Sequence, residues 1–209
     1  MRHIIKMLCL LLFTATAVAQ ERNFILTCGK TQTTIKWSEE HKNGKIRLNT
    51  IQGSERHEYL LEAGYRTESW KIVNSSTNTD LTVSLNHGIY TISGRFKGKG
   101  ISKTVKSKGK PWYQNIAYNA GLTLKNGKSV EYECFRPDNI KLYTMSATKK
   151  GIERFNGKNA LRIEVALTGF MSVFWSCDYY FDSHTLLFVG YKGVNGGPGT
   201  PETKISVSR

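Results

Sequence analysis

The chain has 209 residues, of which 39% are hydrophobic and 22% charged, and its formal net charge is +14. This length suffices for one domain with a hydrophobic core. Apart from a short stretch near the start, no apolar segment approaches the roughly 20 residues of a membrane-spanning helix, which argues against a helical membrane protein.

The first 19 residues have the three parts of a secretory signal peptide. Two basic residues precede an apolar run at residues 7–13, and Ala17 and Ala19 are the small residues that signal peptidase reads. The run is too short to span a bilayer, and Cys9 within it lacks the preceding small residues of a lipoprotein signal. We therefore expect a mature chain from Gln20 onward, with net charge +12 after loss of the two basic residues. We also expect it to be periplasmic or secreted and not lipid-anchored.

Alternation of apolar and polar residues dominates the rest of the chain. Residues 161–168 are the clearest case, because their odd positions are aliphatic and their even positions mostly are not, and residues 81–85 and 173–181 repeat the pattern. A strand turns successive side chains to opposite faces, so each of these strands has one dry face. Antiparallel sheets with a single covered face show this pattern, whereas buried parallel strands are apolar throughout.

Turn residues separate the alternating segments. Asn-Gly pairs at residues 43–44, 126–127 and 156–157 predict tight hairpins, because these residues adopt positive φ readily. Residues 182–185 predict a further turn between two strands. The turns and the alternation together predict about ten to twelve strands.

Helical periodicity is nearly absent. Residues 57–64 and 112–121 are the two places where a short helix is expected, residues 193–201 predict a loop, and residues 205–208 predict a last strand that closes the sheet. We expect an all-β fold with a single domain over residues 20–209. Its architecture is a single curved antiparallel sheet, as a half-barrel or open barrel, with at most short helices.

Three cysteines follow the signal segment. Cys28, Cys134 and Cys177 each lie at an apolar position of their strand, where a free thiol behaves as a small hydrophobic group. Export also permits one disulfide with one thiol left over. The positions favour three free thiols in the core, and one disulfide stays the alternative. The spacing of the cysteines matches neither a metal-binding site nor a redox-active CxxC pair.

Positive charge is concentrated in one region. Residues 81–130 contain no Asp or Glu, and a one-signed field of this kind attracts anions. For an exported protein we expect an anionic lipid headgroup, an acidic glycan or an acidic envelope protein, and no nucleic acid. The alternative is a solvated surface that keeps the protein soluble and its strand edges unpaired. The candidate anion-binding residues are Arg95, Lys97, Lys99, Lys103, Lys106, Lys108 and Lys110.

Cys177 and His184 are a candidate nucleophile and base. If residues 183–184 form a two-residue turn, Cys177 pairs with Gly190, and His184 at the tip is about 20 Å from the cysteine. A nucleophile and its base need to be roughly 3 Å apart. The pair is therefore rejected, and no Gly-x-Ser-x-Gly motif is present.

Two pairs of carboxylates are candidates for general acid–base chemistry. Asp178 and Asp182 are about 13 Å apart along one strand, beyond the roughly 5–9.5 Å of glycosidase pairs. Glu131 and Glu133 share an expected solvent-facing side, where they face the lysines. The histidines have no partner at metal-ligand spacing. We predict no catalytic, metal or cofactor-binding residues, and a hydrolase site assembled across strands stays an alternative.

Aromatic residues predict an apolar cavity. Trp175 and Tyr179 lie on one strand face, and a curved, incompletely closed sheet leaves such a face open to an apolar ligand. Trp112 and Tyr113 follow the lysines, so they are expected at the mouth. With Leu167 these residues form the candidate ligand site for an amphiphile with an acidic head, and plain core packing is the alternative.

The C-terminal half, mainly residues 110–201, carries a set of motifs that resembles exported bacterial proteins of the domain-of-unknown-function family DUF3108. The matching segments are residues 135–137, 142–150, 157–158, 161–169, 174–175, 179–181 and 197–201. The resemblance implies a distant likeness to the lipoprotein carriers LolA and LolB, whose curved half-barrel cradles acyl chains. Counterparts of their covering helices, and of the lipidation cysteine of LolB, are not found in this sequence.

Three hypotheses follow from these patterns. The first is a non-enzymatic protein of the cell envelope that binds an amphiphilic or acyl-chain ligand in the concave face of the sheet. The second is a partner-binding or structural envelope protein that uses the basic hairpin, residues 95–110. The third is a hydrolase of an unrecognised type.

Overall fold

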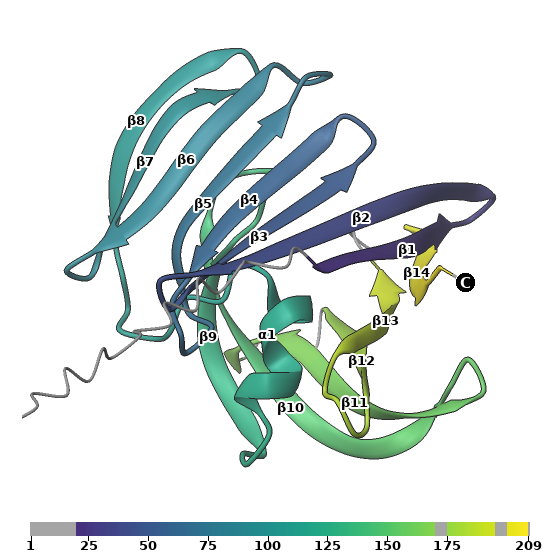
Figure 1. Cartoon of the computed structure of the whole chain (residues 1–209). Coiled ribbons are helices and arrows are strands. Elements are labelled where there is room, and N and C mark those ends of the chain that lie inside the picture. Colours follow the sequence, from purple (N-terminus) through teal and green to yellow (C-terminus); the bar gives the residue numbers. More distant parts are fainter. Residues whose placement is uncertain (1–19, 170–174, 195–199, 209) are drawn as a thin grey trace, which may run out of the picture.

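A computed structural model describes residues 20–169, 175–194 and 200–208 of the chain (Figure 1). The expected signal peptide lies outside these residues. The described residues form one 14-stranded antiparallel sheet with one short helix, α1 (Ile116–Thr123). The sheet is curved and is not closed into a barrel, so the predicted fold class is confirmed.

The first eight strands follow one another outward across the sheet, each paired with the next. They are β1 (Gln20–Cys28), β2 (Thr31–Lys42), β3 (Lys45–Gln52), β4 (Glu55–Leu61), β5 (Thr67–Asn74), β6 (Thr79–Asn86), β7 (Ile89–Phe96) and β8 (Lys99–Lys106). We call them the N-terminal wall. Strand β8 is one edge of the sheet.

The last six strands start at the opposite edge and return to the middle, where β14 pairs with β1. They are β9 (Ser129–Phe135), β10 (Leu142–Phe155), β11 (Lys158–Leu167), β12 (Ser176–Asp182), β13 (Phe188–Val194) and β14 (Glu202–Val207). We call them the C-terminal wall. Strand β14 confirms the expected closing strand.

The chain must cross from the edge at β8 to the edge at β9, and residues 107–128 make this crossing. Figure 1 shows α1, which belongs to this segment, lying between the two walls. Gly121 faces the β12–β13 turn, where a side chain would collide with the carbonyl of Leu186 and the ring of Phe181. The glycine therefore lets the helix lie directly on the C-terminal wall.

Two of the predicted Asn-Gly turns are confirmed. Residues 43–44 and 156–157 have positive φ at both positions and join β2 to β3 and β10 to β11. The prediction at residues 126–127 is wrong, because this pair connects α1 to β9 and makes no hairpin. The expected helix at 112–121 is confirmed by α1, whereas residues 57–61 belong to β4.

The predicted register between β12 and β13 is also wrong. Cys177 pairs with Gly193 and not with Gly190, and a β-bulge follows Tyr180. The turn runs over residues 183–187, because the Asp182 carboxylate accepts hydrogen bonds from successive backbone N–H groups and holds a longer loop. His184 lies exposed in this turn.

The cysteines at positions 28, 134 and 177 are free thiols, as favoured from their strand positions. Cys177 is buried, and the other two are half-buried. Within the described part of the chain, no helix has the length and apolar character needed to cross a membrane.

Candidate functional site

A cavity of about 560 Å³ lies between residues 113–116 and the concave face of β9–β12. This volume falls in the range of roughly 300–1,000 Å³ that is typical of small-molecule sites. Its apolar lining consists of Ile116, Phe135, Met145, Val165, Leu167 and Trp175, and its polar lining of Tyr113, Gln114, Tyr132, Cys134 and Tyr179. The exposed rim is formed by residues 136–138.

Strand register builds the floor of the cavity. Tyr132 on β9 is opposite Met145 on β10, which is opposite Leu167 on β11. Val165, two residues before Leu167, is therefore on the same face. The alternation of β9–β12 thus places this row of side chains on one continuous surface.

Four of the predicted ligand residues come together here. Tyr113, Leu167, Trp175 and Tyr179 all line the cavity, and their side chains leave it unfilled. The indole N–H of Trp175 donates to the carbonyl of Val194 at 2.8 Å, which holds this ring in place.

Trp112 requires a correction. It was expected at the mouth, but it is 1% exposed and does not line the cavity. Its ring meets the rings of Tyr90 and Phe135 edge-on, at 5.1 and 6.2 Å between centroids. Trp112 is therefore a core residue that joins the crossing segment to both walls.

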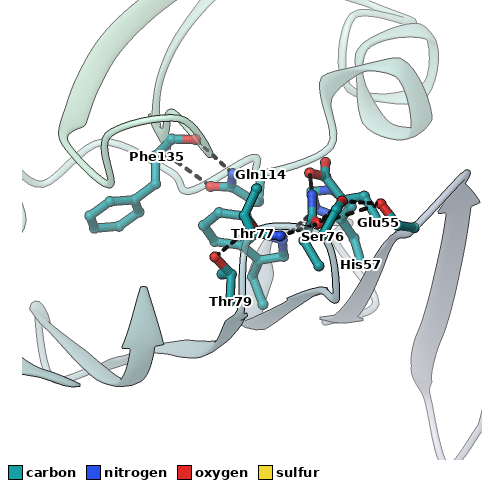
Figure 2. Close-up of polar contacts among 10 residues, drawn as sticks. Glu55, His57, Ser76, Thr77, Thr79, Gln114 and Phe135 are labelled. Atoms are coloured by element: carbon teal, nitrogen blue, oxygen red, sulfur yellow. Dashed lines mark hydrogen bonds and ion pairs between the residues drawn. The ribbon is translucent and has the colours of Figure 1, made fainter. Parts of the chain in front are cut away.

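Gln114 fixes the roof of the cavity over β9. Its side-chain amide donates to the carbonyl of Phe135 at 2.8 Å, and its side-chain carbonyl accepts the N–H of the same residue at 2.9 Å (Figure 2). It also accepts the indole N–H of Trp112 at 2.9 Å. Both the amide nitrogen and the amide oxygen of this side chain therefore hold residues 113–116 against the sheet.

The remaining polar groups of the interior are neutral. Burial raises the pKa of the Tyr132 and Tyr179 hydroxyls well above the ordinary range, and it raises the pKa of the Cys134 thiol to about 12. Neither shift has a contribution from a hydrogen bond to another described side chain. A neutral tyrosine hydroxyl can donate a hydrogen bond to a carbonyl or carboxyl oxygen of a ligand.

The rim carries charge. The Arg136 guanidinium binds the Asp138 carboxylate through two hydrogen bonds of 3.1 and 2.8 Å. The ammonium of Lys97 donates to the backbone carbonyl of Asp138 at 2.8 Å, and that of Lys103 donates to the carbonyl of Ile140 at 3.5 Å. The basic hairpin therefore contacts the turn that forms the mouth of the cavity.

The other candidate anion-binding residues are spread along the same region. Arg95 donates to the side chain of Asn78 at 2.9 Å, and Lys108 to that of Thr144 at 3.5 Å. Lys110 forms an ion pair of 2.8 Å with Glu131. Lys99 and Lys106 lie exposed on the edge strand β8, and within the described ranges neither forms an ion pair.

Glu133 was expected beside Glu131 on a solvent-facing side, and this expectation is wrong. Glu133 is fully buried, with 0% of its surface exposed. The carboxylate accepts hydrogen bonds from the hydroxyls of Tyr90 (2.7 Å) and Ser107 (2.9 Å) and from the N–H of Lys108 (2.6 Å). Glu133 therefore ties the end of the N-terminal wall to β9, which no local pattern indicates.

A second hollow of about 230 Å³ lies on the concave side of β2–β4. His57 lines it, and its ring accepts the indole N–H of the buried Trp70 at 3.0 Å. The other ring nitrogen is 2.6 Å from Glu55, whose carboxylate also accepts from Asn74 (Figure 2). The hydrogen bond from His57 is the main reason that the pKa of Glu55 is lowered.

Within the described residues, no three His, Cys, Asp or Glu side chains are grouped so that they could hold a metal ion. The neutral hydroxyls and thiol, the apolar walls and the basic rim are suited to binding.

Comparison with solved structures places the fold. The chain is similar to a β-barrel-like protein of the domain-of-unknown-function family DUF1849 from Brucella abortus, with a TM-score of 0.62 and 8% identity, over 92% of this chain and 97% of that one. At this identity the likeness concerns the fold alone.

Two further solved structures have lower scores. One is a domain from Vibrio parahaemolyticus named for outer membrane lipoprotein sorting, with a TM-score of 0.34 and 10% identity over 91% of this chain and 83% of that one. The other is a DUF1329 family protein from Desulfovibrio piger, with a TM-score of 0.31 and 10% identity over 93% and 85%. Neither score establishes a shared fold. No family model and no curated protein matches the sequence, so the resemblance to DUF3108 stays a prediction.

Proposed function

We propose that the protein is a non-enzymatic binding protein of the cell envelope that holds an amphiphile with an anionic head. One observation carries the proposal: an apolar cavity opens at a turn that contacts the acid-free basic hairpin, through Lys97 and Asp138 at 2.8 Å. These two features were found separately in the sequence and are adjacent in the fold.

The interior suits an apolar tail. Burial of apolar surface contributes about 25 cal/mol per Å². The polar groups of the interior are neutral, so they neither repel a tail nor demand a charged partner. A carbonyl of the ligand can accept a hydrogen bond from Tyr132.

The rim suits an anionic head. Among the described residues, the ammonium groups of Lys97 and Lys103 donate to backbone carbonyls and form no ion pair with a carboxylate. A carboxylate or phosphate at the mouth would supply that negative charge. An acidic glycan or envelope protein bound by the same hairpin stays the alternative.

Native mass spectrometry of residues 20–209, purified without detergent, tests the proposal first. An added mass that is lost on denaturation is the expected result. A titration with a fluorescent fatty acid then measures affinity for the wild type and for Leu167→Trp, which fills the cavity and should weaken binding about tenfold or more. Ile51→Trp is the control, because Ile51 is 42% exposed and outside the cavity.

A head-group comparison tests the role of the lysines. The double variant Lys97→Glu/Lys103→Glu should bind the fatty acid several-fold more weakly and should bind the matching fatty alcohol as the wild type does. Equal affinity for Leu167→Trp and wild type, or a wild type that binds neither ligand, would contradict the proposal and favour a partner-binding role for the basic hairpin.

A further inference from the structure

Three hollows on the concave face of the described sheet share one side chain. Besides the cavity of about 560 Å³ and the second hollow of about 230 Å³, a third of about 130 Å³ lies against β1, β2 and β13. Tyr179 lines all three. Its ring therefore stands where a tail that extended beyond the main cavity would have to pass.

The first turn of α1 completes the partition. Ile116 lines both the main cavity and the second hollow, and Ala117 lines the second and third. Because α1 lies against β11 and β13, these residues come down onto the sheet beside Tyr179. The partition thus consists of one aromatic ring from the sheet and, from the crossing segment, Gln114 and the first turn of α1.

The Tyr179 ring packs against aromatic neighbours on β13. It meets the ring of Tyr191 at 5.1 Å and that of Phe188 at 6.1 Å between centroids. Burial raises the pKa of its hydroxyl well above the ordinary value, so the hydroxyl is neutral.

We infer that Tyr179 is the residue that limits the length of the apolar tail, so that the preferred ligands are single-chain amphiphiles that end at its ring. This inference rests on the proposed function, because it concerns the tail end of the same site. Removal of the ring would join the second hollow to the main cavity and admit a longer chain.

The test is a chain-length profile. Dissociation constants are measured for straight-chain saturated fatty acids of increasing length with the wild type, Tyr179→Ala and Tyr113→Ala. Tyr113 is the matched control, because it lines the main cavity and neither of the other two hollows. The same atoms are removed in both variants, and only one variant opens the partition.

The wild type should show a preferred length beyond which affinity falls. In Tyr179→Ala the preferred length should increase, with a gain of about fourfold for each further methylene that becomes buried. Tyr113→Ala should change affinities without moving the preferred length. Tyr179→Phe should keep the wild-type profile, because it keeps the ring.

Tyr179→Leu repeats the test with a smaller cavity in case the alanine variant does not fold, which circular dichroism would reveal. If the wild type binds and neither Tyr179→Ala nor Tyr179→Leu moves the preferred length, the inference is wrong and the proposed function stands. An equal movement in Tyr113→Ala overturns it as well. If the wild type binds no fatty acid of any length, the proposed function fails and this inference fails with it.

Discussion

The inner faces of the two walls have the same alternating sequence pattern, but the larger unfilled space lies against the C-terminal wall. In the N-terminal wall, Trp70, Leu81, Val83 and Ile92 are 0% exposed and belong to a continuous core. In the C-terminal wall, β9–β12 border a cavity of about 560 Å³. Alternation therefore predicts which face is dry, and the segment that covers the face decides whether it is filled.

The crossing segment treats the two walls differently. Trp112 is inserted against Tyr90 and Phe135, where three rings pack edge-on. Residues 113–116 stand over β9–β12 and are held at the edge by Gln114, which leaves space beneath them. One short stretch of chain thus completes a core at one end and roofs a cavity at the other.

The largest effect is expected where the walls are joined. Glu133→Ala leaves the buried hydroxyl of Tyr90 and the N–H of Lys108 without their acceptor, so it should lower the free energy of unfolding by about 3 kcal/mol. Urea denaturation measures this loss.

Glu131→Ala is the matched control for that variant. Glu131 is exposed and forms a surface ion pair with Lys110, so its loss should cost no more than about 1 kcal/mol. Equal costs for the two variants would show that the carboxylate of Glu133 does not hold the walls together.

The next effect compares the walls directly. Leu81→Ala removes a side chain from the filled core and should cost about 3 kcal/mol, whereas Leu167→Ala enlarges a space that already exists and should cost about 1 kcal/mol. The two substitutions delete the same atoms. A Leu167→Ala cost as large as that of Leu81→Ala in urea denaturation would mean that the C-terminal wall is packed as tightly as the other.

The parts of this arrangement that could be predicted from sequence are those governed by neighbouring residues. The alternation in β11 and β12 assigns Leu167 and Tyr179 to the inner face, and these residues line the cavity. The Asn-Gly turn at residues 43–44 is equally local. These features need no knowledge of distant segments.

The parts that could not be predicted depend on the crossing segment. Glu133 is polar at an outward position of β9, and only the return of residues 107–113 along that strand covers it. The burial of Trp112 also depends on this segment, because the neighbouring residues in the sequence do not indicate which aromatic rings it contacts. The register of β12 and β13 depends on how many residues the Asp182 turn takes up, which the turn residues alone do not determine.

The smallest effect concerns alkaline pH. Burial raises the pKa of Cys134 to about 12 from an ordinary value of 9.0, so the unfolded chain ionises this thiol first as the pH rises. Stability is therefore fully present below pH 9 and is lost progressively from there toward pH 12. At pH 10 the contribution of this thiol to the loss should be about 1 kcal/mol.

Urea denaturation at pH 8 and pH 10 checks this expectation. Cys134→Ala should lose less stability than the wild type between the two pH values, and the variant Cys28→Ala serves as the reference for a thiol outside the cavity. If the two variants lose the same stability between pH 8 and pH 10, the Cys134 thiol is as well solvated as a thiol at the protein surface. The cavity would then contain more water than its apolar lining indicates.

The pairing of β1 with β14 has a consequence for how the protein is made. These strands are joined in the middle of the sheet although they stand at opposite ends of the sequence, with Phe24 opposite Val207. During synthesis each wall can fold from local hairpins, but the outer edge of β1 keeps its backbone groups unpaired until the last strand has emerged. Premature termination within β14 would therefore leave two adhesive edges at the centre of the sheet, which makes truncated chains prone to aggregate.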